Sequence, residues 1–112
     1  MLFSLTVEYT SAALNAMREN PSSGNRTEAV TNLIEAAGGK VDRIYFRIAN
    51  GPGAQVIFDV PDPQMATAIT SVAVQGGAVQ NVRLDRLFTQ QEVVEVRQKV
   101  GRIRQAYKAP GQ

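Results

Sequence analysis

Few side chains in this 112-residue chain could carry acid–base chemistry. It contains no histidine and no cysteine, so it lacks the commonest general base near neutral pH, the thiolate nucleophile and the usual transition-metal ligands. Carboxylates and phenols remain, and the catalytic candidates among them are Glu8, Asp42, Asp59, Asp85, Tyr9 and Tyr45. None stands at a spacing that catalysis requires, and no carboxylate cluster indicates a Mg²⁺ site. We therefore assign no catalytic residue, no metal ligand and no cofactor.

A second set of polar side chains belongs to a predicted β-hairpin. Residues 40–60 read KVDRIYFRIANGPGAQVIFDV, two alternating runs around an Asn-Gly-Pro-Gly turn. A period of two places one apolar set on the inner face: Ile44, Phe46 and Ile48 in the first run, then Ala54, Val56, Phe58 and Val60 in the second. The opposite face carries Arg43, Tyr45, Arg47, Gln55, Ile57 and Asp59.

That opposite face holds the candidate site. Arginines, carboxylates and a tyrosine gathered in a partly desolvated space suit an anion-binding or acid–base site. The candidate ligand-binding residues, taken from three of the predicted strands, are Arg43, Tyr45, Arg47, Asp59, Arg83 and Asp85. The alternative is that these side chains are solvated, or pair across strands at a dimer contact.

The elements that position these residues follow from periodicity and caps. An alternating first strand contains Phe3, Leu5, Val7 and Tyr9, and a short helix follows over 12–19. After a predicted loop at 21–25, a helix is expected over 26–37, ending at Gly38-Gly39. A further helix starts at Asp62-Pro63 and stops at Gly76-Gly77. The last strand covers about 79–88, where Arg86 implies either a bulge or an end near Asp85.

This order predicts an α+β, ferredoxin-like βαββαβ sandwich. A four-stranded antiparallel sheet would carry two helices on one face, with the first and third strands in its middle. Residues 1–108 are expected to form one domain with a core over 2–88, and 109–112 a tail.

A C-terminal helix is expected over about 90–107, opened by the capping box Thr89…Glu92. Its apolar stripe is Val93, Val96, Val100, Ile103 and Tyr107, and its basic residues are Arg97, Lys99, Arg102, Arg104 and Lys108. The stripe is short for a coiled coil, so we expect it to pack on its own sheet or on a neighbouring subunit. The basic residues would suit a nucleic acid, but the sheet lacks the paired aromatics on which bases stack, so no nucleic-acid partner is assigned. With neither signal peptide nor membrane span, we expect a cytoplasmic protein without a membrane partner.

Several short stretches resemble one family. They are Glu19-Asn-Pro-Ser before Arg26-Thr-Glu-Ala-Val, Gly38-Gly-Lys-Val, Tyr45-Phe, Val60-Pro-Asp, and Asn81-Val-Arg-Leu before Leu87-Phe-Thr. In order and spacing, residues 3–95 resemble the GYD domain family, which implies a ferredoxin-like, dimeric α/β-barrel type of fold and self-association. Where the family carries the Gly-Tyr-Asp that names it, this chain has Gly51-Pro52-Gly53, so no role of that tyrosine or aspartate carries over.

These features favour a binding protein over an enzyme. The leading hypothesis is a homo-oligomer, a dimer or larger, that binds a small ligand or partner at the polar sheet face. One alternative is a cofactor-independent enzyme of the dimeric-barrel monooxygenase or isomerase type, with Tyr45, Arg47 and Asp59 in its pocket. Another is a binder of nucleic acid or of an acidic partner through the basic C-terminal helix.

Overall fold

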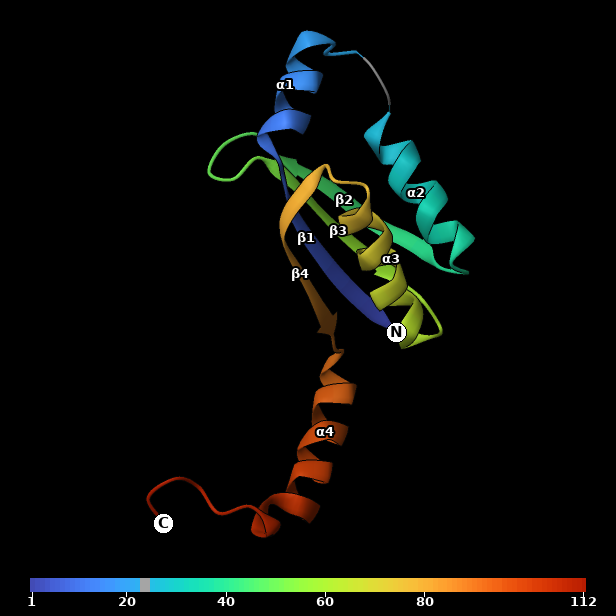
Figure 1. Ribbon diagram of the computed structural model, residues 1–112. Coiled ribbons are helices and arrows are strands. Elements are labelled where there is room, and N and C mark those ends of the chain that lie inside the picture. Colours follow the sequence, from blue (N-terminus) through green and yellow to red (C-terminus); the bar gives the residue numbers. More distant parts are fainter. Residues whose placement is uncertain (23–24) are drawn as a thin grey trace.

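The computed structural model describes residues 1–22 and 25–112, so part of the loop predicted at 21–25 lies outside the described residues. The strands are β1 (Leu2–Tyr9), β2 (Lys40–Arg47), β3 (Gly53–Asp59) and β4 (Val79–Leu87). The helices are α1 (Ser11–Glu19), α2 (Arg26–Ala36), α3 (Pro63–Gln75) and α4 (Gln90–Ile103), with a 3₁₀ turn η1 (Arg104–Ala106) after α4. Figure 1 shows α2 and α3 together on one face of the sheet, which confirms the ferredoxin-like α+β fold.

The sheet has the order β2-β3-β1-β4, with every neighbouring pair antiparallel. The first and third strands are therefore central, as predicted. The hairpin of β2 and β3 is also confirmed. The register places Phe3 opposite Phe58 and Leu5 opposite Val56, so the inward residues of the central strands lie side by side.

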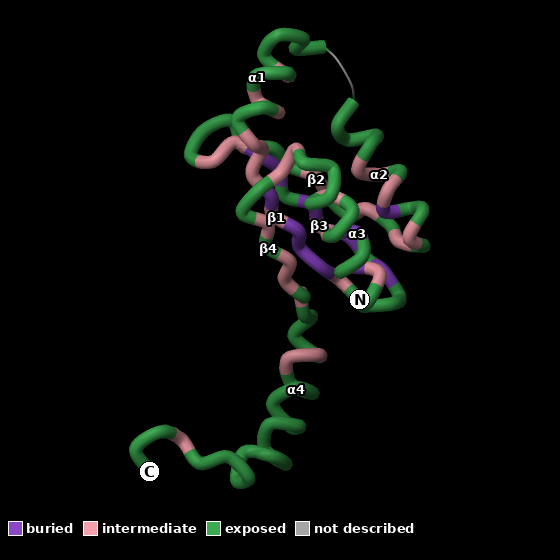
Figure 2. The backbone as a smooth tube through the Cα atoms, viewed as in Figure 1, coloured by how far each residue is buried: buried purple, intermediate pink, exposed green. Residues whose placement is uncertain are grey.

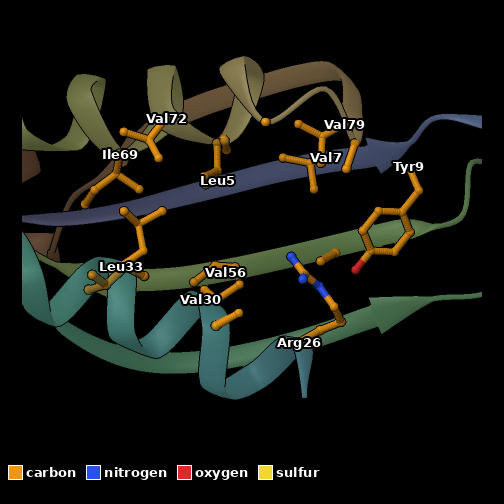
Figure 3. A pocket seen from close by; sticks show the side chains of 16 residues that line it. Leu5, Val7, Tyr9, Arg26, Val30, Leu33, Val56, Ile69, Val72 and Val79 are labelled. Atoms are coloured by element: carbon orange, nitrogen blue, oxygen red, sulfur yellow. The ribbon is translucent and has the colours of Figure 1, made fainter. Parts of the chain in front are cut away.

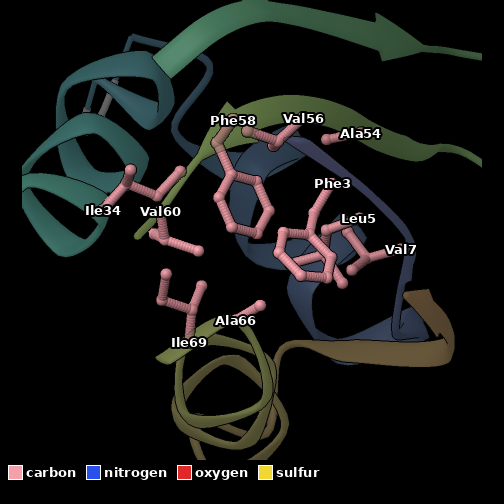
Figure 4. Close-up of a cluster of buried hydrophobic side chains, with 10 residues drawn as sticks. All are labelled: Phe3, Leu5, Val7, Ile34, Ala54, Val56, Phe58, Val60, Ala66 and Ile69. Atoms are coloured by element: carbon pink, nitrogen blue, oxygen red, sulfur yellow. The ribbon is translucent and has the colours of Figure 1, made fainter. Parts of the chain in front are cut away.

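The core lies between the central strands and the two covering helices (Figure 4). The rings of Phe3 and Phe58 stack with their centroids 5.9 Å apart. Ile34 of α2 and Ile69 of α3 are buried with them. The two aromatic rings therefore fill the end of the core where β1 begins and β3 ends.

The inner face of β2 is less buried than its alternation predicts. Ile44 packs against the core, but Phe46 is 47% exposed and Ile48, just beyond the strand, is 94% exposed. The cause is position, because β2 is an edge strand and its far end reaches beyond the apolar layer. Phe46 lies on the predicted inner face, opposite the buried Ala54, but is only half covered, and Ile48 lies outside the strand.

The expectation for Arg86 is also corrected, since neither predicted alternative occurs. Strand β4 continues to Leu87, and Arg86 pairs with Phe3 in regular register. The irregularity lies at the other end, between Thr6 and Glu8 of β1, where Asn81 takes a positive φ of 50°. Arg86 lies at the rim, 4.6 Å over the Phe88 ring.

The helix boundaries follow local chemistry. Asn25 caps α2, Asp62 caps α3 with Pro63 at its start, and Thr89 and Glu92 form the predicted capping box of α4. Gly38 at φ 78° and Gly77 at φ 75° take the left-handed conformation just after α2 and α3. The α-helix α4 ends at Ile103, short of the predicted 107, and continues as η1.

The position of α4 differs from one of the two expectations for it. Figure 1 shows the helix extending away from the sheet, and none of its residues is buried (Figure 2). The alternative in which its stripe packs on its own sheet is therefore wrong. Across the described part of the chain, no helix combines the length and apolarity needed to cross a membrane.

Candidate functional site

The six residues predicted as a site lie on the sheet face opposite α2 and α3, but in separate places. Arg43, Tyr45 and Arg47 belong to the edge strand β2, and Arg83 and Asp85 to the opposite edge strand β4. With neighbouring strands about 4.8 Å apart, the two edges are separated by about 14 Å. Asp59 lies at the end of β3. The six do not meet in one pocket of a single chain.

Most of these residues pair with near neighbours instead. The Arg43 guanidinium donates to the Tyr45 hydroxyl at 3.2 Å, and this hydrogen bond raises the pKa of Arg43. Arg83 and Asp85 form an exposed ion pair at 2.8 Å. Asp59 accepts from the amino terminus of Met1 at 3.0 Å. Each of these contacts joins groups at the edge or the end of the sheet.

Arg47 binds two backbone carbonyl groups and holds a loop in place. Its Nε donates to the carbonyl of Gly51 at 3.2 Å, and its Nη2 donates to the carbonyl of Val7 at 3.1 Å. The same loop is held again where the backbone N–H of Tyr9 donates to Pro52 at 2.8 Å. Arg47 thus fastens the Gly-Pro-Gly loop to the end of β1.

The centre of this face is neutral. Ser4 is buried and accepts a hydrogen bond from Gln55 at 3.2 Å, and Ile57 lies beside Ser4 in the register. The charged residues stand on both edge strands around this centre. A neutral centre within a charged rim is the distribution found in protein–protein interfaces. We call this surface the open sheet face.

A different feature lies on the covered side of the sheet. Helix α2 contacts β2 and helix α3 contacts β4, so both helices lie over outer strands. Between them is a cleft of about 360 Å³ whose floor is formed by Leu5, Val7, Ala54 and Val56 of the central strands (Figure 3). It occupies the half of the apolar layer away from the two stacked phenylalanines.

Small residues explain why this half of the layer is hollow. Positions that could carry bulky side chains are occupied by Ala29, Ala54, Ala73, Gly76 and Ala78. Val30 and Leu33 of α2 face Ile69 and Val72 of α3 across the gap in Figure 3. Side chains of this size cannot close the space between helices placed over the outer strands.

Two polar side chains stand at one end of the cleft. Arg26, in the first turn of α2, and Tyr9, at the end of β1, are both lining residues. Figure 3 shows the guanidinium and the phenol at the same end. Among the described residues, neither polar group has a hydrogen-bond or ion-pair partner.

Tyr9 is among the acid–base candidates that the sequence offers but not among the predicted ligand-binding residues, and Arg26 is among neither. Arg26 precedes the apolar positions of its helix and reads as an ordinary exposed cation. The available signal was the run of alanines and glycines on inward-facing positions, which leaves the predicted core short of volume. The size of the resulting cavity depends on the helix placement, which the sequence pattern does not specify.

The chemistry of the cleft follows from this lining. It offers apolar walls, one permanent cation and one hydroxyl, and no carboxylate among its lining residues. The described residues contain no group of three or more potential metal ligands. The arrangement can hold a small apolar molecule and pair one anionic oxygen with Arg26.

Known proteins resemble this chain in family and in fold. No curated protein matches the sequence. Solved structures do match, among them 5-chloro-2-hydroxyhydroquinone dehydrochlorinase from Burkholderia phenoliruptrix AC1100 in complex with 2,5-dihydroxybenzoquinone. The similarity to it has a TM-score of 0.57 at 13% identity, over 82% of this chain and 98% of that chain, and it shows a shared fold. The family model of the GYD domain matches residues 3–96. This chain belongs to the GYD domain family.

Proposed function

We propose that this protein is a homo-oligomer that binds a small, mainly apolar molecule carrying an anionic oxygen. The ligand lies in the cleft between α2 and α3, and the open sheet face serves self-association. The observation that carries the proposal is the cleft itself, about 360 Å³ with apolar walls and with Arg26 at one end, whose guanidinium has no partner within residues 1–22 and 25–112. Ligand pockets commonly measure about 300–1,000 Å³ and pair apolar walls with a few polar groups.

The geometry favours the cleft over the open sheet face as the ligand site. The six charged and phenolic residues of that face lie on opposite edges and are engaged in local contacts. In the cleft, by contrast, the side chains of Arg26 and Tyr9 have no polar partner among the residues that the structure describes. The structure similar in fold holds 2,5-dihydroxybenzoquinone, a small ring with acidic hydroxyls, and this ligand chemistry agrees with the proposal.

Calorimetric titration with 2,5-dihydroxybenzoquinone tests the proposal, with neutral hydroquinone as a probe of similar size. We expect Arg26→Gln to weaken binding of the acidic probe by about 10–100-fold, because a charge-assisted hydrogen bond contributes about 1.5–3 kcal/mol. Binding of hydroquinone should change little. The dihydroxyquinone is a convenient probe because the chain has no cysteine thiol to react with it.

A matched pair of variants locates the site. Ala29→Phe places a ring in the cleft and should abolish binding of both probes. Ala36→Phe makes the same change on an exposed position of the same helix outside the cleft, and binding should persist. Failure of the wild-type chain to bind either probe at millimolar concentration, or equal effects of the two variants, would refute the cleft as the site.

A second candidate function is catalysis in the same cleft. It is favoured by the dehydrochlorinase activity of the structure similar in fold and by the phenol of Tyr9, which could transfer a proton. Chloride release from 5-chloro-2-hydroxyhydroquinone tests it. Release that is lost in Tyr9→Phe while probe binding persists would identify an enzyme. Binding of the probe without chloride release above the uncatalysed rate would leave the binding protein as the function.

A further inference from the structure

Helix α4 carries an apolar surface that its own fold does not cover. Val93, Val96, Val100 and Ile103 lie on it at alternating steps of three and four residues, which places them on one stripe. Ile103 is 68% exposed, and Tyr107, four residues further along the chain, is 72% exposed. Figure 2 shows the helix exposed over almost its whole length.

A helix in this position needs a partner. Isolated helices of about 12–15 residues are marginal in water, and α4 has 14 residues. The capping box and the basic C-terminal half both help it, but Gly101 weakens it by about 1 kcal/mol relative to alanine. Burial of the stripe against another surface would supply the missing stabilisation.

The charges indicate which surface that is. Both acidic residues, Glu92 and Glu95, stand in the first half of α4, whereas its basic residues begin at Arg97. Two such helices placed antiparallel bring the acidic half of each beside the basic half of the other. The dipoles of the two helices then point in opposite directions, which is the favourable arrangement. A parallel pair would instead place like charges together.

We propose that α4 of one copy packs antiparallel against α4 of a second copy, forming an interface separate from the open sheet face. A two-fold axis near Gln98 sets Val93 opposite Ile103 and Val96 opposite Val100. All four stripe residues on the helix are then covered at once. The apolar stripe favours this occupant over a nucleic acid, which would contact the basic residues and leave the valines in water.

Disulfide crosslinking reads the pairing directly, because the chain has no cysteine of its own. The chains Val96→Cys and Val100→Cys, one carrying a size tag, are mixed and oxidised. We expect the mixed 96–100 dimer to dominate over the 96–96 and 100–100 dimers. In the antiparallel arrangement, identical positions lie about 6 Å apart along the helix axis, from a rise of about 1.5 Å per residue. The control Val94→Cys, outside the stripe on the same helix, should crosslink slowly.

Sedimentation of Val96→Glu/Val100→Glu provides a second measurement. We expect its mass to fall below that of the wild type, while probe binding in the cleft persists. Dominant 96–96 dimers would overturn the antiparallel arrangement. Crosslinking no faster than the Val94→Cys control, an unchanged mass, or salt-sensitive binding of duplex DNA without any stripe crosslink would overturn the pairing itself.

Discussion

At the scale of residues, Arg47 and Arg26 show that the type of a side chain does not reveal its role. Arg47 lies on the polar face of the hairpin and reads as an anion ligand, but it fastens a loop to β1 through two backbone carbonyls. Arg26 reads as a surface cation and is exposed, yet it also lines the cleft, where its guanidinium has no partner in the described part of the chain. The difference lies in which backbone atoms or cavities stand within reach, and only the folded chain determines this.

Replacing Arg47 by Met should therefore destabilise the fold rather than a site on the polar face. Two hydrogen bonds from a charged group are lost and two carbonyls near the loop lose a donor, so we expect a cost of about 2 kcal/mol in the free energy of unfolding. Urea denaturation measures this cost. Arg43→Met is the control on the same strand and face. The exposed Arg43 donates to Tyr45, a likewise exposed surface group, and its replacement should cost less than about 0.5 kcal/mol. Equal costs for both variants would contradict the structural role of Arg47.

At the scale of elements, local sequence chemistry predicts where helices begin more accurately than what they pack against. The caps at Asp62 and Thr89 are read directly from residue type and spacing, and both occur as predicted. The apolar stripe of α4 is also visible in the sequence, but its periodicity does not depend on which surface covers it. The burial of the inner face of β2 is overestimated for a related reason, because alternation does not reveal that Phe46 lies on an edge strand near the rim.

The start of α4 should respond to pH through Glu92. The pKa of this carboxyl is lowered, first because its carboxylate accepts a hydrogen bond from the backbone N–H of Thr89 at 3.1 Å, and also because Arg86 lies 2.9 Å away. A carboxylate with a lowered folded pKa stabilises the structure above its unfolded value of about 4.3. That stabilisation is lost as the pH falls through the folded pKa.

The amide proton shift of Thr89, followed by NMR from pH 7 to pH 2.5, should therefore titrate with a midpoint below the ordinary glutamate value. In Glu92→Gln this titration should disappear, whereas in Glu95→Gln, three residues beyond the capping box, it should remain. A midpoint at or above the ordinary value would show that the capping box does not hold the carboxylate.

At the scale of the whole molecule, sequence periodicity is sufficient for the architecture but not for the cleft. Alternation and caps predict the strand order and the face that α2 and α3 cover, because each strand must bury its apolar side. The cleft depends on where the two helices lie over the sheet and on how Ala54 and Ala73 combine with that placement. These are properties of the assembled layers rather than of any one segment.

Self-association through the open sheet face can be tested at its centre. Ile57→Asp places a charge in the neutral middle of this face and should lower the mass seen by light scattering at micromolar concentration. The wild-type chain should exceed the 12.1 kDa of one copy. The matched variant Val74→Asp, on the exposed side of α3, should leave the mass unchanged. A wild-type chain that stays at 12.1 kDa would contradict self-association by either surface.

The uneven core also bears on how such a protein diverges. Phe3 and Phe58 fill one end of the layer and the cleft occupies the other, so the stacked rings take no part in lining the cleft. Substitutions at Ala29, Ala73 or Ala78 alter the shape of the cavity without touching the stacked rings. Under the proposed function, single substitutions at these alanines would change which molecule fits the cleft while the stacked rings stay in place.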